Sequence, residues 1–271
     1  MKKTKRIACF FTAGYTELNA MKAFMKKANG RVDYIQLCPT GPRRSKDAIK
    51  NRHTDTIHSQ QNGLTGDALI EFVTDFVEKK RFLEERYDAI LIEDDKDDRF
   101  LALQEDGTAR IDQEAWEIFK KNVTKRIRDK CPGIPIIFFY AAPEVEAWFL
   151  SDWDNGFGSI YKDVLTKEQN DYFSVRFRKF VNNSILTSRY KSSIEAYGYF
   201  GGKYRKLSEQ LQSALEKTDF LEGHGSETQY PAIRYSKRIQ GEDMLRQINP
   251  GTILHTCSFY FKEGFLALKR V

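Results

Sequence analysis

The sequence lacks long hydrophobic runs and regular cysteine motifs. No apolar stretch approaches the roughly 18 residues of a membrane-spanning helix. The basic start at residues 1–6 leads into a short apolar run, which indicates a strand and not a signal peptide. The four cysteines show no CxxC spacing, so buried reduced thiols are the simplest interpretation. We therefore expect a cytoplasmic protein that makes no membrane contact.

Sequence motifs that bind nucleotide phosphates are also missing. Gly14 alone in the turn after the first expected strand is too little for a dinucleotide fingerprint, and no GxxxxGK[ST] run is present. Rossmann-type cofactor binding and P-loop phosphate binding are therefore poorly supported. His53 and His58 lie five residues apart in a polar segment, and a zinc role is disfavoured for them.

The composition indicates a folded protein with unevenly distributed charge. The 271 residues are 41% hydrophobic and 13% aromatic, enough for a sizeable core in one large or two small domains. With 44 Lys and Arg against 38 Asp and Glu, the net charge is +6. The run EDDKDD at residues 93–98 carries −4, which leaves +10 on the rest of the chain. A solvated surface loop is the alternative explanation for this acidic run.

The first half of the chain alternates between short apolar runs and longer amphipathic ones. The pattern predicts strands at residues 6–11, 32–39, 89–92 and 134–140, and helices at residues 17–28, 64–86 and 112–130. Such alternation implies right-handed crossovers and a largely parallel sheet flanked by helices on both faces. The polar, basic segment at residues 40–63 is expected to be a loop or a partly ordered arm.

The strand pattern fades after about residue 155. Helical patterns follow at residues 206–217, 236–248 and 253–268, and residues 172–206 are rich in basic and aromatic side chains. We therefore predict an α/β domain at residues 1–155. Residues 156–271 are predicted to form a mostly helical, basic and aromatic extension packed on that domain.

Acidic residues follow three of the four expected strands. Glu17 follows the first, the run at 93–98 the third, and Glu144 and Glu146 the fourth. Because ligands of an open parallel sheet bind at the carboxyl ends of its strands, we expect these carboxylates to converge there. Crowded carboxylates repel each other unless a hard cation such as Mg²⁺ or Mn²⁺ binds their oxygens. The alternative is ordinary first-turn acids that complement a helix dipole.

These residues resemble the Toprim proteins. GYTE at 14–17 looks like their EGxTE signature, and the acidic run looks like their DxD. EVEAWFLSD at 144–152 resembles the ExEAWxLxD segment of a Toprim-like family catalogued as domain of unknown function 4276. RYSKRIQG at 234–241 resembles that family's late SKR-type motif. The resemblance spans roughly the whole chain, and its EAW and YSKR segments are the most specific.

The resemblance implies a Toprim-like fold and a nuclease activity. The family is similar to the Toprim nuclease module of the overcoming-lysogenization-defect nucleases, which implies two-metal phosphodiester cleavage with Mg²⁺ or Mn²⁺. Such modules often act in phage defence with an ATPase partner. Carried over to this chain, the expected catalytic residues are Glu17, Glu144 and Lys237, and the expected metal ligands are Glu17, Glu93, Asp95, Asp97 and Glu146.

Several of these assignments have alternatives. The DxD spacing fits Asp95 with Asp97, and Glu93 with Asp95 fits almost as well. Lys237 would steady charge on the phosphate, although a lysine at a helix start is more often only solubilising. The family also places a Glu at the position of Ala13. A second hypothesis is therefore a non-catalytic Toprim-like sensor or scaffold that binds nucleic acid or an ATPase.

The basic and aromatic stretch suggests a nucleic-acid surface. Arg176, Arg178, Lys203 and Arg205 would contact phosphates, and neighbouring Tyr and Phe side chains would stack on unpaired bases. The alternative is that many of these aromatic side chains form the core of the helical half.

Overall fold

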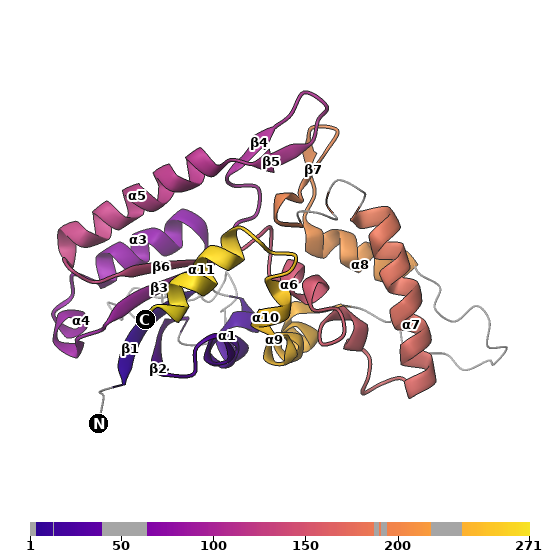
Figure 1. Cartoon of the computed structure of the whole chain (residues 1–271), viewed down its shortest axis with the longest axis horizontal. Coiled ribbons are helices and arrows are strands. Elements are labelled where there is room, and N and C mark those ends of the chain that lie inside the picture. The colour runs from indigo at the N-terminus through magenta and orange to yellow at the C-terminus, as the bar shows by residue number, and fades with distance from the viewer. Residues whose placement is uncertain (1–3, 13, 40–63, 187–189, 191–193, 218–234) are drawn as a thin grey trace, which may run out of the picture.

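The fold is built on a four-stranded parallel sheet with the order β2-β1-β3-β6 (Figure 1). We describe it from a computed structural model, which defines residues 4–12, 14–39, 64–186, 190, 194–217 and 235–271. The strands are β1 (Lys5–Phe11), β2 (Val32–Cys38), β3 (Ala89–Asp95) and β6 (Ile136–Ala141). The predicted α/β class with a largely parallel sheet is confirmed.

The strand order reverses beside β1. From β1 the chain passes to β2 on one side and then crosses to β3 on the other, so the topological switch point lies between β1 and β3. Phe11 is paired with Glu93 and Asp95 with Ala141, so β1, β3 and β6 end at one edge of the sheet. In open α/β sheets, the crevice at such an edge is where ligands bind.

Helices cover both faces of the sheet (Figure 1). On one face, α1 (Tyr15–Ala28), α6 (Glu146–Ser151) and α11 (Tyr260–Lys269) pack against Cys9 and Phe11. On the other, α3 (Gly66–Phe76) and α5 (Gln113–Lys130) pack against Ala8 and Phe10. These β1 side chains are fully buried, which explains why the strand appears as an unbroken apolar run.

Two predicted helices are each interrupted. The helix expected at residues 64–86 is α3 followed by a separate α4 (Lys80–Glu85), and the one expected at 253–268 is α10 (Pro250–Ile253) followed by α11. Val77 and Phe82 both face the α3 side of the core, so the apolar periodicity continues across the first break. The pattern therefore could not reveal that break.

Two short antiparallel hairpins were not predicted. One joins β4 (Leu101–Leu103) to β5 (Ala109–Ile111), and the other joins β7 (Tyr199–Phe200) to β8 (Lys203–Tyr204). Their turns use Gly107 and the pair Gly201-Gly202, all with positive φ. The hairpins lie side by side (Figure 1), and the Gly202 N–H donates to the Gly107 carbonyl at 3.0 Å. Strands of two or three residues are too short to show a period of two.

The part after residue 155 is mostly helical, as predicted. Among its described residues lie α7 (Lys167–Phe180), α8 (Leu207–Lys217), α9 (Glu242–Gln247), short helical segments at Phe157–Ser159, Val181–Ile185 and Ile194–Ala196, and η5 (Lys237–Gly241). A capping box between Thr166 and Gln169 starts α7. The helix expected at 236–248 corresponds to η5 followed by α9. None of the helices in the described residues is long and apolar enough to cross a membrane.

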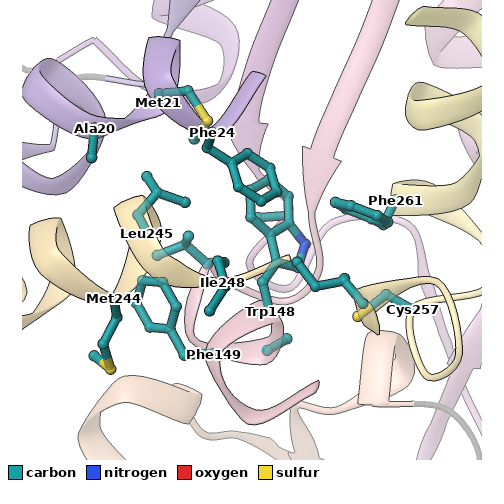
Figure 2. Close-up of a cluster of buried hydrophobic side chains, with 14 of the residues drawn as sticks. Ala20, Met21, Phe24, Trp148, Phe149, Met244, Leu245, Ile248, Cys257 and Phe261 are labelled. Carbon is teal, nitrogen blue, oxygen red and sulfur yellow. The ribbon is translucent and has the colours of Figure 1, made fainter. Parts of the chain in front are cut away.

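One hydrophobic core joins the two predicted parts (Figure 2). At its centre, Trp148 stacks on Phe24 of α1 at 5.2 Å between ring centroids and meets Phe139 and Phe261 edge-on at 5.6 and 5.2 Å. Leu245 of α9 belongs to the same cluster. The helical extension therefore packs directly on the sheet domain. The cysteines are all free and buried, as expected.

Candidate functional site

The acidic run begins inside β3, and this decides which acids share a face. Glu93 and Asp95 point to the α1 side of the sheet, whereas Asp94 points to the opposite side and pairs with Arg99 at 2.6 Å. Glu93 accepts a hydrogen bond from the Thr12 backbone N–H at 3.1 Å. Glu93, Asp94 and Lys96 are fully buried, so the interpretation of residues 93–96 as a solvated loop is wrong.

Asp97 is not brought to the same face. It follows the strand in a turn with φ 53°, and its carboxylate pairs with Lys206 at 3.3 Å. Its side chain is 37% exposed. Asp95, by contrast, accepts a hydrogen bond from the Val145 N–H at 3.1 Å, at the end of β6. The arrangement therefore favours Glu93 with Asp95 as the DxD pair, and Asp97 lies at the rim.

Glu17 lies in the first turn of α1 with its carboxylate folded back over Gly14. A Cβ atom on Gly14 would overlap that carboxylate, so a larger residue at this position would push the Glu17 side chain aside. Glu17 is 3% exposed. Burial raises its pKa to about 7; nearby Lys237 lowers it, and the carboxylates of Glu146 and Asp94 raise it further.

Glu144 and Glu146 follow β6 and are both buried. Glu144 accepts hydrogen bonds from the Ser208 N–H and hydroxyl, each at 2.9 Å. Burial raises the pKa of Glu144, but Lys237 and Ser208 outweigh it, so this pKa lies below its ordinary value. Glu146 accepts a hydrogen bond from the Tyr235 hydroxyl at 2.7 Å. Both acids therefore bond to residues that are distant in the sequence. A role limited to the dipole of their own helix does not account for these bonds.

Lys237 brings the positive charge to this cluster. Its ammonium group lies 3.4 Å from Glu144 Oε1 and 3.1 Å from Glu146 Oε2. Burial lowers its pKa, but Glu146, Asp95, Glu144 and Glu17 raise it more, so the pKa lies well above its ordinary value. The hydroxyl of Thr16 donates to the Lys237 carbonyl at 2.8 Å and ties this segment to α1. These contacts contradict the alternative that Lys237 is only a solubilising lysine at the start of a helix.

The donor atoms of the cluster suit a hard divalent cation. All are carboxylate oxygens, and Glu93 Oε1 is buried without a hydrogen-bond partner. Burial also raises the pKa of both Glu93 and Asp95 well above the ordinary value, and neighbouring carboxylates raise each further. Such repulsion is what a bound cation relieves. Among the residues described, however, no three acidic, histidine or cysteine side chains already stand as ligands of one ion.

Replacing Glu17 with Gln should change how stability depends on pH. The folded pKa of about 7 exceeds the ordinary 4.5, so the folded chain keeps a proton that the unfolded chain releases between these values. The metal-free protein should therefore lose stability as pH rises from about 4.5 to about 7. Glu17→Gln should make this slope shallower and add about 2–3 kcal/mol at pH 7, while the raised pKa values of Glu93 and Asp95 keep part of the slope. Urea unfolding in the presence of a chelator at several pH values measures both the slope and the change in unfolding free energy.

The matched control is Glu114→Gln, which changes an exposed first-turn acid of α5. It should leave the pH slope as in the wild type. A Glu17→Gln protein whose stability still falls between pH 5 and 7 as in the wild type would show that Glu17 is not the titrating group.

The predicted nucleic-acid residues are exposed. Arg176 and Arg178 belong to α7, and Lys203 and Arg205 belong to the β8 region. Three of them lie over aromatic rings: Arg176 over Tyr172 at 5.3 Å, Arg178 over Trp153 at 5.6 Å and Arg205 over Phe200 at 5.4 Å. Many other aromatics of this half are core, as the alternative held: Phe173, Phe177, Tyr190 and Tyr197 are buried.

Two hydrogen-bond partners of the acids were not predicted from the sequence, and three positions discussed there lie outside the described residues. Ser208 was missed because nothing in the sequence links it to Glu144, 64 residues earlier. Tyr235 lies in a recognised motif but had no assigned role. Ala13, His53 and His58 lie outside the described residues.

Comparison of the chain with protein-family models, curated proteins and solved structures gave no significant match. The functional argument therefore depends on the chemistry of the site itself.

Proposed function

We propose that this protein is a divalent-metal-dependent nuclease of Toprim type that hydrolyses phosphodiester bonds. The observation that carries the proposal is the convergence of buried carboxylates from the ends of three parallel strands at the switch-point edge, together with one lysine. Mutual repulsion and burial make this cluster costly unless cations compensate it. The family resemblance of the same residues supports Mg²⁺ or Mn²⁺ as the cation.

Each residue has a role in this proposal. Glu17, Glu93, Asp95 and Glu146 would hold the metal, and two divalent ions, when bound, activate a water and stabilise the leaving oxygen. A metal bound at Glu17 would lower the pKa of about 7 that this carboxyl group has without metal, so Glu17 would act in catalysis as a charged ligand of the ion that activates the water. Lys237 would contact a non-bridging phosphate oxygen. Glu144 is held by Ser208 and positions Lys237.

A second candidate is a Toprim-like sensor or scaffold without catalysis that binds nucleic acid or an ATPase. Two observations favour it: Ala13 replaces the family's Glu, and Lys237 already compensates part of the cluster without metal. Phage defence and an ATPase partner come from the resemblance alone, and no contact in the described residues bears on them.

Cleavage assays separate the two candidates. Labelled single- and double-stranded DNA and RNA are incubated with Mg²⁺, Mn²⁺ or chelator, using the wild type and Ala13→Glu. A nuclease should cleave at least one substrate with metal and none with chelator. Cleavage by Ala13→Glu alone would mean that Ala13 has disabled the site. If neither protein cleaves any substrate with any metal, even when an ATPase is supplied, the sensor or scaffold is favoured.

Nucleic-acid binding should fall steeply with salt, because contacts to phosphates release counterions. Changing Arg176, Arg178, Lys203 and Arg205 together to Glu should abolish binding, because four phosphate contacts are replaced by charges that repel phosphate. The control reverses four exposed charges of α5 instead: Lys121, Lys125, Arg126 and Arg128. Fluorescence polarisation measures both. Equal affinities of the two variants would place the binding surface elsewhere.

A further inference from the structure

The ammonium group of Lys237 lies where a cation would be needed. It contacts Glu144 and Glu146 at 3.4 and 3.1 Å, and Asp95 and Glu17 are also close enough to attract it. Glu146 Oε2 has no hydrogen-bond donor and is neutralised by this ion pair. The lysine therefore supplies the compensating charge that buried carboxylates require.

The backbone that carries Lys237 is fixed, whereas its side chain can leave. Thr16 bonds the Lys237 carbonyl at 2.8 Å, the Ser236 N–H donates to Gln240 at 2.8 Å, and Tyr235 is buried against Phe157 with 5.2 Å between ring centroids. The Lys237 side chain is nevertheless 38% exposed. Its flexible four-carbon stem can thus swing the charge toward solvent while the backbone stays in place.

A divalent ion and this ammonium group need the same oxygens. A metal bound at Glu146 Oε2 on the side where the ammonium group now lies would repel that group strongly, because two cations would share one oxygen in a buried site. Metal binding at that position therefore requires Lys237 to move.

We propose that Lys237 is a tethered cation that occupies the metal site until a divalent ion displaces it. The inference rests on the proposed function. It adds regulation to that function, because the lysine sets the metal concentration at which the site fills. Once displaced, the ammonium group is free to meet the negative charge of the substrate phosphate.

Lys237→Met tests the proposal, because methionine keeps much of the stem and removes the charge. Calorimetric titration with Mn²⁺ alone should show Kd roughly tenfold lower than in the wild type, since one charge-assisted contact no longer has to be broken. The control is Lys206→Met, which removes a lysine that pairs with Asp97 at the rim. It should change the Kd by less than about twofold.

Thermal unfolding gives a second readout that needs no activity. Without metal, Lys237→Met should melt below the wild type because the cluster loses its cation, and saturating Mn²⁺ should raise its melting temperature more than that of the wild type. If the variant does not fold in chelator, Lys237→Gln is titrated instead.

The failures can be told apart. Equal or weaker Mn²⁺ binding by the Lys237 variants overturns the tethered cation and leaves the nuclease proposal standing. No Mn²⁺ binding by the wild type or any variant overturns both.

Discussion

Replacing Asp95 with Asn should reduce metal-dependent cleavage by about 10²- to 10³-fold while leaving the fold intact. Asp95 ends β3 at the switch-point edge, and its Oδ1 accepts the Val145 N–H at 3.1 Å. The amide oxygen of asparagine can accept the same hydrogen bond, so the connection between β3 and the β6 end survives. What is lost is a negative charge that a divalent ion needs.

The metal-free stability of this variant should not fall. Burial raises the pKa of Asp95 well above its ordinary value; Lys237 lowers it, and Glu17, Glu144 and Glu146 raise it further. A neutral amide removes these repulsions. Loss of cleavage with unchanged or higher melting temperature would therefore identify a ligand and not a structural residue.

Asp97→Asn is the matched control, with the same chemical change two residues later. Asp97 pairs with Lys206 at the rim, so its loss should cost at most about fivefold in cleavage. Single-turnover gels with Mn²⁺ measure both variants. Comparable losses in both variants would mean that the ligand pair is Asp95 with Asp97, and a larger loss for Asp97→Asn than for Asp95→Asn would mean that Asp95 is not the ligand. Undiminished cleavage by Asp95→Asn would point to a contaminant.

The largest expected loss of stability follows from Trp148→Ala, at about 3–5 kcal/mol. The indole is fully buried and meets Phe24 and Phe261 (Figure 2). It also meets Phe139, so its ring contacts come from three different elements. Removing it leaves a cavity that α1, β6 and α11 cannot all close at once. Urea unfolding, monitored by circular dichroism, gives the change in free energy.

Leu103→Ala provides the comparison, since that side chain is 56% exposed and should cost less than about 0.5 kcal/mol. A loss below about 1 kcal/mol for Trp148→Ala would mean that the cluster joining the two parts of the chain is not a packed core.

The sheet and the acidic edge could be predicted because their signals are local. Buried parallel strands appear as apolar runs, and each acid follows its own strand. Which two acids form the pair could not be predicted, because this depends on where β3 ends. The apolar pattern ends at residue 92, whereas the strand continues through the acids to Asp95. Contacts such as Ser208 with Glu144 arise only from folding and leave no local pattern.

The helices α9 and α11, which cover the α1 side of the sheet, are synthesised late. A chain is made from its N-terminus, and domains begin to fold as they emerge. All four strands of the sheet are complete by Ala141, yet α9 and α11, which pack on α1 and β6, follow about 100 residues later. During that interval Phe24 and Trp148 lack the cover of α9 and α11, so we expect early intermediates to bind chaperones through this face. The same delay keeps Lys237 away from the carboxylates until late in synthesis.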